Sequence, residues 1–373
     1  MANDVLVERQ NDFQLIETNA FDGLYVYIDR EISEGEFNIP SITDIKESIS
    51  EQHFKIEENH DFMHGDIIYL NNRRRKISGV LNQNARQNTL LVTEKCDNLC
   101  SFCSQPPNEK DDIHLYLVAA EAINNYRDDT VVGITGGEPT LDKEKFLKFL
   151  TLINSNNKQT PLHILTNGRS FSDKEFTKEV LKLSSKREIV WGIPVHGHNQ
   201  KLHDDCVGAE GAFFETLEGL MNLSYAREFI ELRTVVTQKN YKFLPHISEL
   251  ITSSLPFVAT HAIMNLEPRG WARRNFEDLT IPPQEQMKYI DKAVSLNTIH
   301  GISSSLYNYP LCSVPSGLRR FYHKSISDWK NYYPDFCNTC VEKKDCGGFF
   351  SSSIGVYLDY SSISGDKHET KSS

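Results

Sequence analysis

The sequence predicts an α/β protein built on a parallel sheet, and three observations support this fold class. From about residue 88, short apolar runs rich in β-branched residues alternate with longer amphipathic segments. The runs are apolar throughout, as expected of strands that are buried on both faces. Polar and glycine-rich motifs follow the runs directly, where active sites of parallel α/β proteins collect. Six such β/α units could form an open sheet or most of a barrel.

The individual elements follow this alternation along the chain. Strands are predicted at 89–93, 130–135, 162–166, 188–195, 231–237 and 257–266. Helices are predicted near 113–127, 142–155, 173–184, 212–226, 241–252 and 283–296. Residues 1–86 are more polar, with short candidate strands at 23–29 and 66–70, and predict a small β-rich domain. We interpret the basic run at 73–76 as a solvated hairpin tip rather than as a nucleic-acid site.

The composition is that of a globular chain and argues against several classes of function. The 373 residues are 39% apolar and 24% charged, and their formal net charge is −11. This acidic balance disfavours general nucleic-acid binding. No apolar run approaches the roughly 20 residues that a membrane span needs, and no signal peptide is recognisable at the N-terminus. We therefore expect a cytoplasmic protein whose thiols are kept reduced.

Eight cysteines in such a protein are more typical of metal ligands than of crosslinks. Cys96, Cys100 and Cys103 form a C-x₃-C-x₂-C motif directly after the first predicted strand. A [4Fe–4S] cluster normally takes four cysteines, so three would leave one iron open to a substrate or a cofactor. The alternative is a zinc site that takes its fourth ligand from elsewhere in the chain.

A second motif, GGEPT, begins at Gly136 directly after the second predicted strand. Two adjacent glycines let the backbone approach a ligand closely and leave its polar groups free to bond. In isolation the same letters would also suit an ordinary glycine turn.

The cysteine motif and GGEPT, in this order and after these strands, resemble the radical S-adenosylmethionine (SAM) superfamily over residues 88–265. The resemblance implies a partial (β/α)6 TIM-like barrel with a [4Fe–4S] cluster whose open iron chelates SAM. It further implies that an electron donor such as flavodoxin or ferredoxin drives SAM cleavage. The resulting 5′-deoxyadenosyl radical takes a hydrogen atom from the substrate, and the cofactor supplies this chemistry.

The resemblance also implies roles for individual residues. Cys96, Cys100 and Cys103 match the cluster ligands. The positions that match SAM-binding residues are Phe102, Gly136, Gly137, Glu138, Asn167 and Arg233. Among these, Phe102 matches the aromatic residue beside the adenine, and Asn167 matches a polar contact to the ribose. Arg233 could meet the methionine carboxylate, and a structural ion pair is the alternative for a strand arginine.

Further motifs between about residues 65 and 350 resemble the HxsC family, the radical SAM maturases of His-Xaa-Ser repeat peptide systems. These motifs are CSQPP, GIPV, MNLEPRGWAR, LYNYPLC, KSISDWKNYYPDFC and CGGFF. The resemblance implies modification of a ribosomally made precursor peptide, with a second maturase as a candidate partner. The alternatives are a radical SAM enzyme that acts on a small molecule such as a nucleobase precursor, and a non-catalytic zinc-stabilised binding module.

Four of the five remaining cysteines lie in a C-terminal extension at 301–373, which follows a core at 87–300. They are Cys312, Cys337, Cys340 and Cys346. Their spacing slightly favours zinc, whereas the resemblance favours an auxiliary [4Fe–4S] cluster in a SPASM/twitch-like extension. Gly347 and Gly348 would let backbone N–H groups approach the sulfurs.

Three histidines form an H-x-H-x₄-H array after the fourth predicted strand, at His196, His198 and His203. They could hold a further metal, line the substrate cavity or transfer a proton. Cys206 follows in what we expect to be a polar loop, as an ordinary cysteine or as a thiol that reacts with substrate. No catalytic residue is assigned beyond His196, His198 and Cys206 as candidates.

Overall fold

The structure is a computed structural model. It describes five strands within residues 6–55, and then residues 65–71, 76–85, 87–110, 112–127, 129–155, 158–226, 228–327 and 330–354. The chain forms two compact units. The first consists of Met1–Glu94, Glu109–Leu165 and Lys178–Ile189, and the second of Lys95–Asn108, Thr166–Thr177 and Val190–Ser373. No helix in the described ranges combines the length and apolar character that crossing a membrane requires.

The N-terminal part of the first unit contains a sheet of short, mostly antiparallel strands. In sheet order these are β1 (Leu6–Gln10), β2 (Phe13–Glu17), β3 (Gly23–Ile28), β6 (Ile67–Asn71), β7 (Lys76–Leu81), β5 (His53–Lys55) and β4 (Glu36–Asn38). Strands β3 and β6 coincide with the two candidate strands of the sequence. Arg73, Arg74 and Arg75 lie outside the described residues, so the interpretation of this basic run stays a prediction, as does the domain boundary at residue 86.

A second sheet carries the parallel strands. Among the described residues this sheet contains seven strands. Their order in the sheet is β8 (Asn88–Thr93), β9 (Val132–Gly136), β10 (Leu162–Leu165), β11 (Ile189–Pro194), β12 (Phe229–Val235), β13 (Thr260–Met264) and β14 (Ser303–Tyr307). Within the first unit β8, β9 and β10 pair in parallel, and within the second β11 to β14 do the same. The predicted parallel α/β class is therefore confirmed. The closure of the sheet toward a barrel stays a prediction.

Strand β14 was absent from the predicted set because its sequence, SSSLY, lacks the apolar run of a buried strand. Of its serines, Ser304 and Ser305 are buried, and hydrogen bonding compensates for the burial of Ser304. The Ser304 hydroxyl accepts from Asn297 Nδ2 at 3.0 Å, and the same amide lies 3.0 Å from the ring of His261 on β13. A polar network thus replaces apolar packing at this edge of the sheet.

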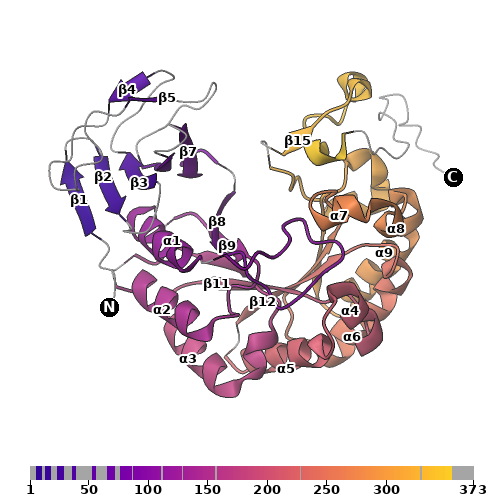
Figure 1. Cartoon of the computed structure of the whole chain (residues 1–373). Helices are drawn as coiled ribbons and strands as arrows, with labels where there is room; N and C mark the ends of the chain where they lie inside the picture. Colours follow the sequence, from indigo (N-terminus) through magenta and orange to yellow (C-terminus); the bar gives the residue numbers. More distant parts are fainter. Residues whose placement is uncertain are drawn as a thin grey trace. The chain divides into compact units, whose positions relative to one another are not determined.

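The helices alternate with the strands as predicted. They are α1 (Ile113–Asn125), α2 (Lys143–Ile153), α3 (Lys174–Ser184), α4 (Gln200–Val207), α5 (Ala212–Ser224), α6 (Leu244–Ser254), α7 (Trp271–Arg274), α8 (Phe276–Leu279) and α9 (Pro283–Ile299). In the second unit, α4, α5 and α6 lie together on one side of β11 and β12 (Figure 1). Helices α4, α7 and α8 were not predicted, because they are short and begin in polar or glycine-rich segments.

Helix α2 illustrates how sequence sets these elements. Its N-cap residue Asp142 accepts a hydrogen bond from the Lys145 N–H at 3.1 Å, which satisfies one of the free donors at the helix start. Its buried residues Phe146, Phe149, Leu150 and Ile153 recur at the spacing of a single helical face.

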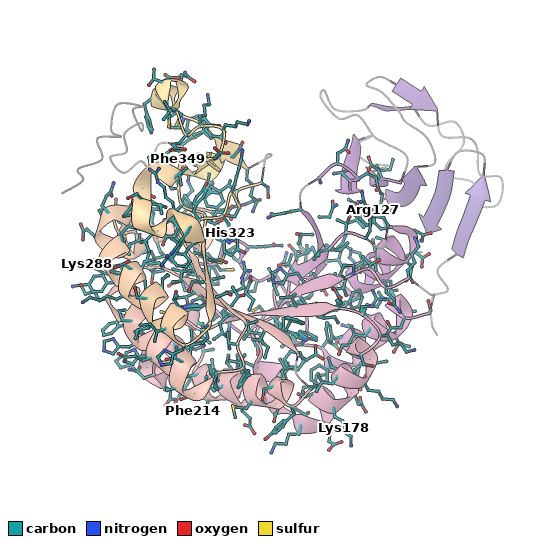
Figure 2. All side chains as sticks on the ribbon, turned by 180° about the vertical axis from the view of Figure 1, so that it is seen from behind. Arg127, Lys178, Phe214, Lys288, His323 and Phe349 are labelled. Atoms are coloured by element: carbon teal, nitrogen blue, oxygen red, sulfur yellow. The ribbon has the colours of Figure 1, made fainter. Side chains whose placement is uncertain are left out.

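The C-terminal extension consists mainly of short 3₁₀ turns and one antiparallel strand pair. The pair joins β15 (Asn331–Tyr332) to β16 (Phe349–Phe350). Phe349 is labelled in this segment in Figure 2. Such turns place several cysteines close together without a helix or a long strand.

Candidate functional site

The segment Lys95–Asn108, here called the cysteine loop, follows β8 and carries the first three cysteines. Inside the loop the Cys103 N–H donates to the Cys100 carbonyl at 3.0 Å, and the Asn98 N–H donates to Cys96 Sγ at 3.4 Å. Burial, followed by the negative charges of Cys103 and Cys96, raises the pKa of the Cys100 thiol. The three sulfurs therefore lie near enough to repel one another when ionised, and bound iron would remove that repulsion.

Arg169 fixes one side of the cysteine loop within the second unit. Its Nη1 donates to the Asp97 carbonyl at 3.0 Å and to Asn98 Oδ1 at 2.8 Å. The same guanidinium forms ion pairs with the carboxylates of Asp97, at 3.0 Å, and of Glu215 on α5, at 2.6 Å. Charge-assisted bonds of this kind are the strong ones, so Arg169 is a principal anchor of the loop.

The opposite side of the loop is held by the segment around α7. The Trp271 N–H donates to the Cys103 carbonyl at 2.9 Å, and Asn275 Nδ2 donates to the Ser101 carbonyl at 2.8 Å. Gly270, before Trp271, has φ +59°, and a Cβ there would lie 2.6 Å from the Ser104 carbonyl oxygen. Only glycine allows this approach, so the EPRGW motif is matched sterically to the cysteine loop.

The aromatic residue of the loop, Phe102, packs inside the second unit. Its ring contacts His196 edge-on, with 4.8 Å between the centroids, and it borders a buried cluster formed by Leu266, Ala272 and Leu279. His196 is buried, and the Val235 N–H donates to its Nδ1 at 3.4 Å. Burial, together with His203, lowers the pKa of His196 to about 3, so its ring is neutral at physiological pH.

Asn167 and Arg233, the two polar residues matched to SAM, both have protein partners here. Asn167 Nδ2 donates to Asp97 Oδ1 at 2.6 Å, and its Oδ1 accepts from the Arg169 N–H at 3.0 Å. The Arg233 guanidinium forms an ion pair with Glu231 on the same strand. The ion pair weighed as the alternative for Arg233 is thus present, and contacts of either residue to SAM stay predictions.

The GGEPT turn lies in the first unit, at the end of β9. The Gly137 N–H donates to the Thr93 carbonyl at 2.8 Å, and a Cβ on Gly136 would lie 2.2 Å from that same oxygen. Glu138 is buried, and its Oε1 accepts from the Thr140 N–H at 2.8 Å and from its hydroxyl at 2.6 Å. Hydrogen bonds to Thr93 and within Glu138–Thr140 therefore hold the turn.

Residues 90–228 match the protein family described as the radical SAM superfamily. The chain carries a radical SAM domain. This match includes the cysteine loop and the GGEPT turn. No curated protein matches the chain in sequence.

Solved structures match the chain in part. SuiB from Streptococcus suis, bound to S-adenosylmethionine, is 13% identical over 58% of this chain and 49% of SuiB, with a TM-score of 0.46. Native anSMEcpe with bound AdoMet is 15% identical over 58% of this chain and 62% of that chain, with a TM-score of 0.44. The Escherichia coli coproporphyrinogen III oxidase HemN is 16% identical over 58% and 53%, with a TM-score of 0.43. This chain thus spans about half the length of SuiB.

Beyond the radical SAM domain, the four C-terminal cysteines line one small cavity. Its other walls include the aromatic rings of Tyr333, Phe336 and Phe349. Burial and then the charge of Cys346 raise the pKa of Cys312 to about 12. The gathering of four thiols that the spacing predicts is therefore present.

Backbone N–H groups approach Cys346 as expected for a metal-bound sulfur. The N–H groups of Leu311 and Gly348 each donate to Cys346 Sγ at 3.3 Å. Gly347 behaves differently from the prediction, because its N–H donates to the Tyr322 hydroxyl at 2.6 Å.

Across the described ranges, no three His, Cys, Asp or Glu side chains are grouped as ligands of a single metal ion. The choice between zinc and an iron–sulfur cluster at either cysteine set stays a prediction.

The three histidines of the H-x-H-x₄-H array do not form a further metal site in the described part of the chain. Strand β11 ends at Pro194, so His196 and His198 do not continue it as a single face. His196 is buried toward Phe102, whereas the His198 ring lies 5.1 Å from that of His246 on α6. Cys206 was expected in a polar loop and instead lies fully buried in α4, where burial raises its pKa to about 11.

Sequence reasoning missed the anchors Arg169, Trp271 and Asn275. Trp271 stands in the quoted motif MNLEPRGWAR, whereas Arg169 and Asn275 lie outside the quoted motifs. No motif shows which distant group a residue bonds, and Asn275 and Ser101 are separated by 174 positions. These contacts depend on the tertiary fold.

Proposed function

We propose that this protein is a radical SAM enzyme that modifies a ribosomally made peptide, as a maturase of the HxsC type. The observation that carries the proposal is the C-x₃-C-x₂-C loop at the end of β8, inside a matched radical SAM domain and tethered on two sides. When bound, a [4Fe–4S] cluster with SAM supplies reductive cleavage of the sulfonium to a 5′-deoxyadenosyl radical that takes a hydrogen atom from substrate.

The residues of the chain serve to hold and orient that cofactor. Cys96, Cys100 and Cys103 are the proposed iron ligands, and the tethers described above fix the backbone that carries them. Phe102 is held against the Leu266 cluster, from which it would border the adenine. Gly136, Gly137 and Glu138 are proposed to receive the methionine amino group, because a buried carboxylate held by Thr140 is a ready acceptor for an ammonium.

We further propose an auxiliary [4Fe–4S] cluster on the four C-terminal cysteines. The cavity that these cysteines line and the N–H groups directed at Cys346 support this proposal. Zinc is the competing assignment, and metal analysis separates the two.

The peptide substrate is supported by the motifs shared with the HxsC family, including EPRGWAR, whose glycine is sterically matched to the cysteine loop. A cytoplasmic electron donor such as flavodoxin or ferredoxin and a second maturase complete the proposed system. The competing substrate class is a small molecule.

The test begins with anaerobic purification, iron and sulfide analysis, and assay for 5′-deoxyadenosine with SAM and dithionite. The expected result is a brown protein that loses about half of its iron when Cys96, Cys100 and Cys103 are all replaced by alanine. Replacing Cys337 and Cys340 should remove the other half and leave SAM binding in place. A colourless protein that contains only zinc would refute the proposal.

The substrate is tested by mass spectrometry of a His-Xaa-Ser repeat precursor peptide after incubation with enzyme, SAM and reductant. A mass change that depends on Cys100 supports the maturase. SAM cleavage without any change in the peptide would favour the small-molecule alternative.

A further inference from the structure

A small cavity of about 50 Å3 lies in the second unit beyond the carboxyl ends of β12, β13 and β14. Val236, Leu266 and Pro310, which follow these strands, form one wall, and Phe349 and Phe350 of the C-terminal extension form another. Its walls are largely apolar, as is usual for ligand sites. A single compact apolar side chain therefore suits the cavity.

The cavity also contains an unsatisfied hydroxyl. Gln286, at its wall, is fully bonded, because its Oε1 accepts from the Tyr309 hydroxyl at 2.8 Å and its Nε2 donates to the Ile281 carbonyl at 2.9 Å. Thr280 Oγ1, in contrast, is buried and has no hydrogen-bond partner within the described residues. Buried polar atoms are normally paired, so a bound ligand is a natural partner for this hydroxyl.

An open cleft of about 630 Å3 adjoins the cavity, since Pro268 lines both. Three cationic side chains line the cleft, those of Arg269, Arg273 and Lys330, against the single carboxylate of Glu267. The cleft is thus cationic, although the whole chain carries a formal net charge of −11. A cationic recess on an acidic protein selects an anionic group.

The three cationic side chains of the cleft differ in whether they already have partners within the protein. Lys330 Nζ lies 3.3 Å from a Glu267 oxygen, and Arg273 Nη1 donates to the Ser352 carbonyl at 2.7 Å. Arg269 is exposed, and its guanidinium has no partner among the residues that the structure describes. Ser352 Oγ, also in the cleft, is buried without a hydrogen-bond partner in that same part of the chain. Arg269 is therefore the cation most available to a carboxylate.

We infer that the cavity and the cleft together bind a segment of the peptide substrate in which an apolar residue adjoins an acidic residue. The apolar side chain occupies the cavity near Thr280, and the carboxylate meets Arg269. Gly270 and Trp271, the next residues, contact the cysteine loop at Ser104 and Cys103, so the bound segment lies beside that loop. This inference rests on the proposed peptide substrate and specifies how that peptide is recognised.

The test measures binding of overlapping fluorescein-labelled segments of the His-Xaa-Ser precursor to the anaerobic holoenzyme in the presence of SAM. We expect the tightest segment to contain an acidic residue next to an apolar one. The Arg269→Gln variant should weaken its binding roughly tenfold or more, since a charge-assisted bond is lost. Arg274→Gln is the matched control, because Arg274 is an exposed neighbour in α7 that lines neither recess, and it should bind as the wild type does.

A double-mutant cycle then identifies the partner of Arg269. Replacing the acidic residue of the peptide by its amide should weaken binding to the wild type and have little further effect on Arg269→Gln. Thr280→Val, which keeps the side-chain shape, should weaken binding by a smaller factor.

Three results would overturn the inference. Equal peptide binding by the Arg269→Gln and Arg274→Gln variants would do so, as would a loss of SAM binding rather than peptide binding in Arg269→Gln. Either can occur while the wild type still modifies the peptide, in which case the proposed function stands. If no precursor segment binds the wild type, the substrate proposal and the inference fail together.

Discussion

Replacing Arg169 by glutamine tests whether the cysteine loop depends on its charged anchor. The Arg169 side chain is only 15% exposed, and it holds Asp97 and Asn98 of the loop together with Glu215 of α5. A net bond to a charged group contributes about 1.5–3 kcal/mol. The Glu215 carboxylate is 46% exposed, so solvent screening reduces its share to well under 1 kcal/mol. We expect the substitution to lower the free energy of unfolding by about 2–4 kcal/mol.

The assay combines urea unfolding with iron and sulfide content and 5′-deoxyadenosine formation. Arg187→Gln is the matched control, because Arg187 donates to the carbonyl groups of Thr160, at 3.0 Å, and Ile153, at 2.6 Å, in the first unit. Both variants should lose comparable stability, whereas only Arg169→Gln should lose iron and activity. If the two variants retain equal iron and equal SAM cleavage, the loop does not need this anchor and the reasoning is wrong.

Two further predictions concern the frame around the site. Gly136→Ala should lower the free energy of unfolding by about 3 kcal/mol, because the new Cβ would overlap the Thr93 carbonyl. Gly317→Ala is the control: its Cβ meets nothing within 4 Å, so the free energy of unfolding should change by less than about 0.5 kcal/mol. Equal urea midpoints would contradict this. Burial lowers the pKa of His261 to about 4. The unfolded chain therefore binds a proton near pH 6.5 that the folded state does not bind, and the free energy of unfolding falls as the pH drops from about 6.5 to 4. His261→Gln should remove about 2 kcal/mol of that fall between pH 7 and pH 5, as measured by unfolding at these two pH values, and an unchanged pH dependence would show that the ring is not held neutral.

Local sequence predicted the parts of the fold that follow from local chemistry. Apolar β-branched runs gave the strands from β8 to β13, and thiols at cluster spacing marked both cysteine sets. The same reasoning failed at β14 and at Cys206. Serines form a buried strand there because Asn297 bonds Ser304, and Cys206 is buried because the polar HDDC segment becomes the helix α4.

The anchors of the site escaped prediction for a related reason. A motif gives the residue types but not their partners. Trp271 and Asn275 bond backbone groups of the cysteine loop, and Arg169 bonds backbone and side-chain groups of the loop as well as Glu215. Asn167 shows the same limit, since its amide bonds Asp97 in this structure. Contacts of this kind follow from the assembled tertiary structure rather than from local pattern.

The bond between Asn275 and Ser101 has a consequence for how the protein is made. A nascent chain that has emerged only as far as α6 already contains its first three thiols and the Arg169 anchor, yet it lacks one of the two segments that hold the cysteine loop. We expect the proposed cluster to be held firmly only after α7 has been synthesised and has bonded the loop.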